Sequence, residues 1–335
     1  MAGEEFFAFA PRGCGRGPVC ATSPARTSAP PSTPDPRARH AANQRITTLS
    51  VGVAVFLIAI KAFALGASGS VSILASLTDS VLDLAASLTT FFAVRWAAAP
   101  PNDQHRYGRG KAEALSALVQ AGLVFASAVF IGWEAIQRMI DPRPIIAGGW
   151  AVGVMVVSIL VTLGLVWAQT RAIRTSGSLA VSGDRAHYAA DLGAGVVVLI
   201  GVASGAWLGA AGLDAAAGLV VAVWLVWGAV AILRASADQL LDRGVDEDVR
   251  ARIVAAVRAD PRIGGVHQLR TRMAGTTLMI QMHMDLDPDQ SLADAHAVIV
   301  GAETRILEIF PGADVLIHPD PRTGGVGPTA VPVTE

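Results

Sequence analysis

The feature that most limits how this chain can fold is a series of six apolar stretches, each long enough to cross a lipid bilayer. A helix needs about 20 apolar residues to span the hydrocarbon core. The six stretches occupy residues 48–66, 71–97, 112–137, 149–170, 186–209 and 213–234. Apolar stretches of this length are typical of membrane-spanning helices. We therefore predict a six-helix transmembrane domain over residues 46–240.

Charge is distributed unevenly around this apolar region. Only 16% of the residues are charged, whereas a soluble domain usually has about 25%. Charged residues return after position 240, so residues 241–322 are predicted to form a soluble domain. Residues 1–45, which are rich in Pro, Ala and Arg, and residues 323–335 are predicted to be disordered tails. The sequence has no basic block typical of nucleic-acid binding, and we expect neither a nucleic-acid partner nor an organic cofactor.

The basic residues of the connecting loops predict how the helices are oriented. They gather in the loop between the second and third stretches and in the loop between the fourth and fifth: Arg95, Arg106, Arg109 and Lys111, then Arg171, Arg174 and Arg185. Loops enriched in Lys and Arg face the cytoplasm. We therefore expect a multi-pass protein of the cytoplasmic (inner or plasma) membrane with both termini on the cytoplasmic side.

Two pairs of ionisable residues lie inside these apolar stretches, each pair spaced by four positions. Asp79 and Asp83 lie in the second stretch, and His187 and Asp191 lie in the fifth. Residues four apart share one face of a helix, and ionisable residues inside membranes are usually functional. One imidazole and three carboxylates form a donor set that suits a tetrahedral Zn²⁺ site. The alternative is that these residues cap helix ends or form a structural polar bridge between spans.

These motifs resemble those of the cation diffusion facilitator family, of the bacterial zinc/proton antiporter type. The segment 69–80 is similar to the second helix of that family, and the resemblance extends over about residues 45–322. It implies that Asp79, Asp83, His187 and Asp191 form the transport site. A set of one His and three Asp resembles that of zinc and cadmium transporters, and imidazole favours zinc over manganese. Cd²⁺ and Fe²⁺ remain alternative cargoes.

The soluble region alternates between helical and strand patterns. Helices are expected over 246–259 and 291–309, and strands over 265–272, 277–286 and 313–318. This αββαβ order is typical of a small α+β, metallochaperone-like domain. In the second strand His283 alternates with Met282 and Met284, so its side chain is expected on the polar face of the sheet.

The resemblance also implies a regulatory zinc site in the soluble domain. The residues that match a binuclear site are His267, His283, His296, His318 and Asp320. The first ion would be held by His267, His283 and Asp320, and the second by His296 and His318, with Asp320 bridging. The alternative is that these histidines only decorate the surface of an α+β fold.

A further metal site in the loop after the second stretch is expected to be weak. Relatives often have an Asp and two His there, but this chain has Asn102 and Arg109 at two of those positions. A guanidinium cannot act as a ligand. Asp103 and His105 are left as a weak second site, and we expect this loop to be solvated.

The resemblance further implies a homodimer. Lys111 and Asp242 match a salt bridge that locks the family's dimer near the membrane surface, whereas sequence alone would treat both as ordinary charges at helix ends. The expected partners are therefore a second copy of the chain, the lipid bilayer, divalent metal ions and protons.

The function predicted from these features is export of a divalent metal cation from the cytoplasm by Zn²⁺/H⁺ antiport. Metal and protons compete because the ligands must be deprotonated to bind a metal. An uncoupled metal channel and a membrane-anchored metal sensor remain alternatives. An enzyme is not expected, because an intramembrane zinc protease would need an H-E-x-x-H motif and the sequence contains none.

Overall fold

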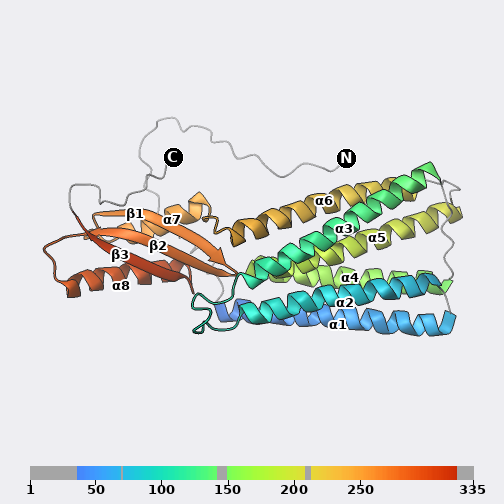
Figure 1. Ribbon diagram of the computed structural model, residues 1–335, viewed down its shortest axis with the longest axis horizontal. Helices are drawn as coiled ribbons and strands as arrows, with labels where there is room; N and C mark the ends of the chain where they lie inside the picture. Colours follow the sequence, from blue (N-terminus) through green and yellow to red (C-terminus); the bar gives the residue numbers. More distant parts are fainter. Residues whose placement is uncertain (1–35, 69–70, 142–148, 208–212, 323–335) are drawn as a thin grey trace, which may run out of the picture. The chain divides into compact units, whose positions relative to one another are not determined.

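The computed structural model describes residues 36–68, 71–141, 149–207 and 213–322. Its first part consists of long helices that run side by side as a bundle (Figure 1). These helices are α1 (Pro36–Ser68), α2 (Val71–Ala97), α3 (Ala112–Ile140), α4 (Gly149–Ser176), α5 (Leu179–Trp207) and α6 (Leu213–Leu240). Within the bundle α1 packs against α2 and α4, while α3 packs against α5 and α6.

Five segments of the described chain are long and apolar enough to cross a membrane. They are Ala38–Ala67, Ser76–Ala97, Ala112–Ile140, Val152–Ser176 and Ala215–Leu240. Helix α5 is not among them, and its first half carries the charged residues Asp184, Arg185 and Asp191. A helical membrane domain is therefore confirmed, whereas the sixth span stays a prediction.

The start of α1 corrects the predicted extent of the N-terminal tail. Residues 36–45 were expected to be disordered, but they form the first turns of α1. Proline is well tolerated in a first helical turn, where its missing N–H has no intrahelical partner to lose. Asn43 is fully buried, and Arg39 donates to the carbonyl oxygens of Thr276 and Pro311, so tertiary contacts extend α1 beyond its apolar stretch. The other predicted tail residues, 1–35 and 323–335, lie outside the described residues.

Helix α5 also begins earlier than its apolar pattern indicates. Its predicted span began at residue 186, but the helix begins at Leu179. Ser178 precedes it, and its Oγ accepts a hydrogen bond from the backbone N–H of Val181 at 3.3 Å, which is the arrangement of a serine N-cap. His187 therefore lies well past the first turn, and so does Asp79 in α2. Neither residue is placed to cap a helix end.

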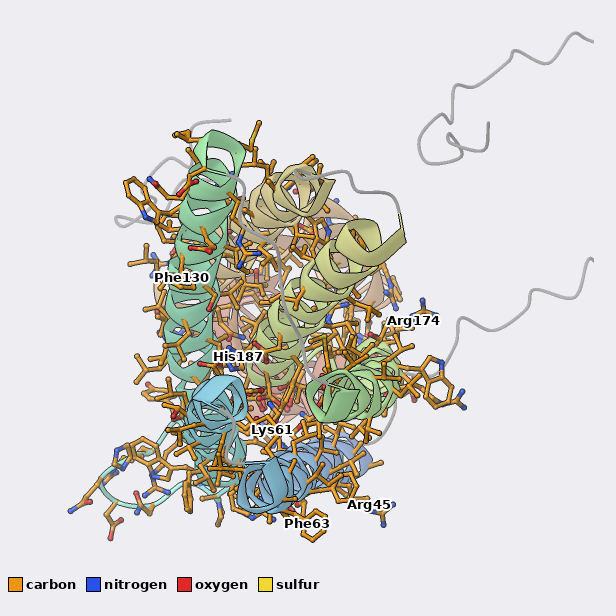
Figure 2. All side chains as sticks on the ribbon, turned by 90° about the vertical axis from the view of Figure 1, so that its right-hand side faces the viewer. Arg45, Lys61, Phe63, Phe130, Arg174 and His187 are labelled. Carbon is orange, nitrogen blue, oxygen red and sulfur yellow. The ribbon has the colours of Figure 1, made fainter. Side chains whose placement is uncertain are left out.

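The bundle buries polar side chains among its apolar ones and exposes large apolar side chains on its surface. Ser50, Ser87 and Gln120 are almost completely buried in its interior. Phe63 and Phe130 are largely exposed and point away from the bundle (Figure 2). This is the reverse of a water-soluble helical protein and fits a surface solvated by lipid.

The C-terminal part is a three-stranded sheet with two helices. Its elements are α7 (Glu247–Arg258), β1 (Gly265–Ala274), β2 (Thr277–Leu286), α8 (Leu292–Ile309) and β3 (Asp314–Pro321). The order in the sheet is β1-β2-β3, with β1 antiparallel and β3 parallel to β2. Strand β2 is thus central. The predicted αββαβ order is confirmed.

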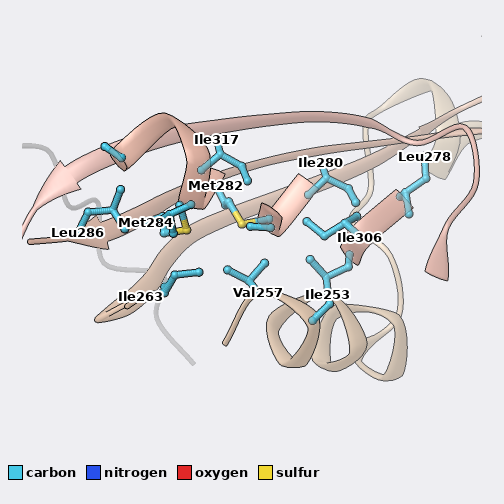
Figure 3. Packing of buried hydrophobic residues seen from close by; sticks show 14 residues of the cluster. Ile253, Val257, Ile263, Leu278, Ile280, Met282, Met284, Leu286, Ile306 and Ile317 are labelled. Atoms are coloured by element: carbon cyan, nitrogen blue, oxygen red, sulfur yellow. The ribbon is translucent and has the colours of Figure 1, made fainter. Parts of the chain in front are cut away.

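The core of this domain lies between one face of the sheet and the two helices (Figure 3). Ile280, Met282 and Met284 point from β2 into this core, whereas Gln281 lies on the opposite, exposed face. Val257 from α7 and Ile306 from α8 are fully buried against the strands. Because side chains alternate along a strand, the buried methionines leave His283 on the face that the helices do not cover.

One close helix contact gives a test of the bundle. A Cβ at Gly183 of α5 would lie 2.9 Å from Gln120 Cβ and 3.1 Å from Ala117 Cα of α3, whereas a Cβ at Gly164 of α4 meets nothing within 4 Å. We expect Gly183→Ala to destabilise the bundle by about 1–3 kcal/mol through overpacking. Gly164→Ala should be neutral or stabilising by up to about 1 kcal/mol, because alanine is the better helix former. Thermal unfolding of the two purified variants in detergent measures both effects, and equal melting temperatures would contradict the predicted contact.

Candidate metal sites

Three of the four predicted intramembrane ligands meet between α2 and α5. His187 Nε2 lies 3.2 Å from Asp83 Oδ1 and 3.9 Å from Asp191 Oδ2. One ligand atom from each of these residues lies within 4.8 Å of the other two. The spacing of four positions along α5 places His187 and Asp191 on one face, as expected. Asp83 reaches them from a different helix, so the cluster depends on how α2 and α5 pack.

Two buried polar atoms of these residues have no hydrogen-bond partner within the described chain. His187 Nδ1 and Asp191 Oδ2 are both buried from solvent and make no hydrogen bond. Buried polar atoms are nearly always hydrogen-bonded. Asp191 Oδ2 faces His187 Nε2 at 3.9 Å without a hydrogen bond, so this oxygen is available to bind a cation. The side chain of His187 itself is only 8% exposed.

Asp79 does not join this cluster. It lies one helical turn from Asp83 and is exposed, and none of its carboxylate oxygens completes the group formed by the other three residues. The described hydrogen bonds between α2 and α5 are made by Asp83 and Ser87, on the side away from Asp79. The hydrogen bonds between the two helices thus begin at Asp83 and continue towards the C-terminal end of α2. The predicted four-residue site is incomplete because Asp79 lies outside it.

A buried polar network lies one turn from the cluster. Asp184 Oδ1 accepts a hydrogen bond from Ser87 Oγ at 3.2 Å, and Asp184 Oδ2 accepts one from Gln169 Nε2 at 2.8 Å. Gln169 also donates to Ser50 Oγ at 3.1 Å, and Tyr188 Oη lies 2.8 Å from Ser87 Oγ. These bonds connect α1, α2, α4 and α5. The sequence analysis did not identify Asp184, although it precedes His187 by three positions and therefore shares its helix face.

A second cluster is formed on the polar face of the sheet by strand register. His267 of β1 is paired with His283 of β2, and His283 is paired with His318 of β3. The imidazole rings of His267 and His283 have centroids 5.3 Å apart, and those of His283 and His318 are 4.8 Å apart. Three histidines that are distant in sequence thus form a row across the strands, as paired residues on one face must.

Asp320 is the carboxylate at the centre of this row. Its Oδ2 lies 2.8 Å from His283 Nδ1 and 3.3 Å from His267 Nε2, and its Oδ1 lies 3.3 Å from His318 Nε2. His267, His283 and Asp320 place one ligand atom each within 4.8 Å of one another. Two of these contacts, those with His283 and His267, join residues of different strands, so the group has the donors and the proximity of a zinc site.

Asp285 is an additional member that the sequence analysis missed. Its Oδ1 lies 3.2 Å from His267 Nε2, and the register pairs it with Asp320. Gly265 is its other paired neighbour, and a Cβ there would clash with Asp285 Oδ2, so glycine leaves room for this carboxylate. The signal in the sequence was its position two residues after His283, which places both side chains on one face.

His296 is not brought to the sheet cluster within a single chain. It lies on α8, where it is exposed to solvent. Helix α8 covers the apolar face of the sheet through Ala295, Val298 and Ala302, whereas the other histidines occupy the opposite face. The predicted pairing of His296 with His318 therefore does not form in one chain, because the sheet separates them.

The loop between α2 and α3 shows no clustered ligands among its described residues. Asp103 and His105 are both exposed. The backbone N–H of His105 donates to Asn102 Oδ1 at 2.9 Å, and its imidazole contacts the ring of Trp96 edge-on, with centroids 6.3 Å apart. The side chain of Asn102 thus stabilises a turn, and the solvated-loop expectation describes this segment.

The predicted pair of Lys111 and Asp242 forms within one chain. Lys111 Nζ lies 2.9 Å from Asp242 Oδ1 and also donates to the carbonyl oxygen of Leu240 at 3.2 Å. Arg272 Nη1 donates to Asp242 Oδ2 at 3.2 Å. The hydrogen bond from Lys111, and then that from Arg272, hold the pKa of Asp242 below its ordinary value. The carboxylate thus joins the start of α3, the end of α6 and strand β1.

Comparison with known proteins agrees with this architecture. The sequence profile of the cation efflux transmembrane domain matches residues 47–241, and that of the cation efflux protein cytoplasmic domain matches residues 245–322. The chain belongs to the cation efflux family. Members of this family, also called cation diffusion facilitators, are membrane transporters, and this cation efflux protein accordingly has membrane-spanning helices and a dimerisation domain that follows them. Its activity is the efflux of divalent metal cations.

Similar proteins cover most of this cation efflux protein. It is 40% identical over 269 residues to the cation-efflux pump FieF of Cronobacter sakazakii, which covers 80% of this chain and 89% of that one. It is 41% identical over 274 residues to FieF of Shewanella oneidensis, covering 81% of this chain and 92% of that one. A solved structure, the metal-bound C-terminal domain of the CzcD transporter from Thermotoga maritima, is 31% identical, covers 24% of this chain and 93% of that one, and has a TM-score of 0.23.

The Lys111–Asp242 contact predicts a pH-dependent local stability. Asp242→Asn removes the charge but keeps the left-handed backbone at φ 59°, which asparagine adopts as readily as aspartate. Because the folded-state pKa lies below the unfolded-state value, the contribution of Asp242 is complete above about pH 4 and is lost as the pH falls through the folded-state pKa. Hydrogen exchange of the amides at the end of α6 should therefore be faster in the variant than in the wild type at pH 7, with the difference vanishing at low pH.

Asp238→Asn is the matched control for this experiment. Among the described residues Asp238 forms a salt bridge with the nearby Arg243, at 2.5 Å, and the Asp238 side chain is 43% exposed. An exposed local pair contributes little, so this variant should exchange like the wild type at both pH values. Equal exchange in Asp242→Asn and Asp238→Asn at pH 7 would contradict the role of Asp242.

Proposed function

We propose that this protein exports Zn²⁺ from the cytoplasm in exchange for protons, with Cd²⁺ or Fe²⁺ as alternative cargoes. The observation that carries the proposal is the meeting of Asp83, His187 and Asp191 within 4.8 Å between two helices of the bundle. Nitrogen and carboxylate oxygen are zinc ligands, and a set that includes imidazole favours zinc over manganese. The FieF relatives are cation-efflux pumps by name, which supports the direction of transport.

Helix α5 would be the sixth span of this transporter. Two of its ionisable residues are buried away from lipid: Asp184 is 1% exposed and His187 is 7% exposed. An ionisable residue inside the membrane is tolerated when it faces the interior of a bundle. Six spans place both termini on one side, and the basic loops assign that side to the cytoplasm.

In this mechanism Zn²⁺ enters from the cytoplasm and displaces protons from the ligands. Asp79 would supply the fourth ligand through a movement of α2 relative to α5, since it lies one turn from Asp83 and outside the cluster. The same movement would change which side of the membrane can reach the site. Protons would rebind on the far side as the metal leaves, because a ligand holds either a proton or the metal.

Two alternatives share the same ligands. An uncoupled metal channel would conduct without a proton gradient, and a membrane-anchored metal sensor would bind metal without moving it. The names of the FieF relatives, which are cation-efflux pumps, favour a transporter over a sensor.

Transport in proteoliposomes tests the proposal. Wild-type protein should show Zn²⁺ flux that increases with an imposed pH gradient, and Asp83→Asn should lower that flux to the background of empty vesicles because one of three clustered ligands loses its charge. Asp103→Asn is the matched control, since it neutralises an exposed aspartate of a loop and should leave flux unchanged. Flux that is indifferent to the pH gradient would identify a channel, and binding without flux would identify a sensor.

We propose in addition that the sheet cluster binds regulatory zinc and that the protein acts as a homodimer. His267, His283 and Asp320 would hold the ion, with His318 and Asp285 beside them. The fit rests on the donors, because imidazole and carboxylate atoms converge there from three strands whose register is locked by the sheet. Lys111 and Asp242 would stabilise the junction between the membrane helices and this domain in each subunit.

Histidine variants separate this site from the surface histidines. His283→Ala should remove one bound Zn²⁺ per chain, measured by titration against a chromophoric chelator, because His283 lies at the centre of the row. His296→Ala should bind as much Zn²⁺ as the wild type, because His296 is exposed on α8. Equal losses in both variants would show that His296 joins the site, for instance from a second chain.

A further inference from the structure

Lys61 is a buried basic residue in the middle of the apolar part of α1. It is only 8% exposed, and Figure 2 shows it on the interior side of α1, whereas Phe63 points outward. Its Nζ donates to Ser80 Oγ at 2.6 Å and to the carbonyl oxygen of Ser76 at 3.1 Å, both on α2. A lysine that reached towards the membrane surface would not make these contacts. The two hydrogen bonds to α2 therefore hold Lys61 inside the bundle.

The ammonium lies on the face of α2 that carries the proposed metal ligands. Ser76, Ser80 and Asp83 follow one another at helical spacing, and Asp79 is the neighbour of Ser80. The charges that act on this ammonium from the surrounding helices are those of Asp83, Asp79 and Asp191. Within the described residues both of its hydrogen-bond acceptors are uncharged. Its positive charge is therefore not neutralised by a single ion pair. It acts on the carboxylates of Asp79, Asp83 and Asp191 together.

The Lys61 ammonium changes the net charge of the site when a divalent cation is bound. The proposed site has three carboxylates, and a divalent cation neutralises two of their negative charges. With a neutral imidazole, one negative charge remains. An uncompensated charge in the low dielectric of a membrane is costly. The ammonium supplies the missing positive charge without occupying a ligand position, because it is bound to Ser80 and not to a carboxylate.

We infer that Lys61 is a fixed positive charge of the transport site, which balances the third carboxylate when a divalent cation is bound and limits how tightly that cation is held. The inference rests on the proposed transport function. It makes Lys61 a positioning residue that touches no metal. Because the ammonium stabilises the carboxylates both with and without the cation, its effect on the affinity is its repulsion of the bound cation. The site therefore releases its cargo more readily than the ligands alone would allow.

Two substitutions separate the charge from the hydrogen bonds. Lys61→Gln removes the charge and keeps an N–H donor for Ser80 and Ser76, whereas Lys61→Arg keeps the charge. Zn²⁺ affinity is measured by chelator competition on the purified full chain, with His283→Ala in every variant to silence the sheet cluster. We expect Lys61→Gln to bind Zn²⁺ about tenfold more tightly or more, because two positive charges near one another repel strongly in a medium of low dielectric. Lys61→Arg should stay within about threefold of the parent.

A second readout is Zn²⁺ flux at saturating metal, which should fall in Lys61→Gln, because release slows, and should be largely retained in Lys61→Arg. If Lys61 were only a structural bridge between α1 and α2, its loss would disorder the metal ligands. Lys61→Gln would then bind Zn²⁺ more weakly than the parent protein. Equal or weaker binding in Lys61→Gln would therefore overturn the inference. So would loss of folding in both Lys61→Gln and Lys61→Met, because the residue would then act through stability.

The affinity measurement also separates a failure of the proposed role of Lys61 from a failure of the proposed transport function. The parent protein must bind one Zn²⁺ that Asp83→Asn abolishes. If it binds none, the proposed transport site is contradicted. If it binds one and Lys61→Gln leaves the affinity unchanged, the site stands and only the role of Lys61 is wrong.

Discussion

The cost of placing charge in a lipid environment is the constraint on which this structure depends. Asp83 and His187 are tolerable inside the bundle because each finds the other across the contact between α2 and α5. Asp191 joins them from the next turn of α5, and Lys61 approaches from α1. The faces of α1, α2 and α5 that carry Lys61, Asp83 and His187 are thereby turned inward, which leaves apolar side chains such as Phe63 for lipid.

The polar interior of the bundle follows from the same constraint. Asp184 is buried beside Ser87 and Gln169, which satisfy its oxygens by hydrogen bonds. The apolar surfaces of these helices are solvated as well by lipid as by another helix. Polar contacts of this kind therefore help to specify which helices pack together. Close approach at Gly183 adds shape to this specification. The interior is therefore organised by hydrogen bonds and small residues more than by a hydrophobic core.

The two candidate metal sites are built on backbones of different stiffness. In the bundle the donors come from two helices that meet through a few side-chain contacts, and Asp79 lies outside the group. In the C-terminal domain the row of His267, His283 and His318 is set by backbone pairing in a continuous sheet. A site between helices can change when the helices shift, whereas a site on a sheet stays assembled. The first arrangement suits a cargo that must leave, and the second suits an ion that remains.

Sequence alone determined the helical membrane domain, the αββαβ order and the residues that share a helix or strand face, because hydropathy and the periods of helix and strand are local properties of the chain. It did not determine that α1 continues through Asn43, that Asp184 is buried, or that His296 is separated from the other histidines by the sheet. Those outcomes depend on which faces of distant segments pack together. Only the tertiary structure decided that Asp83 meets His187 while Asp79 does not, because that contact depends on where two helices approach, and no spacing within either helix encodes it.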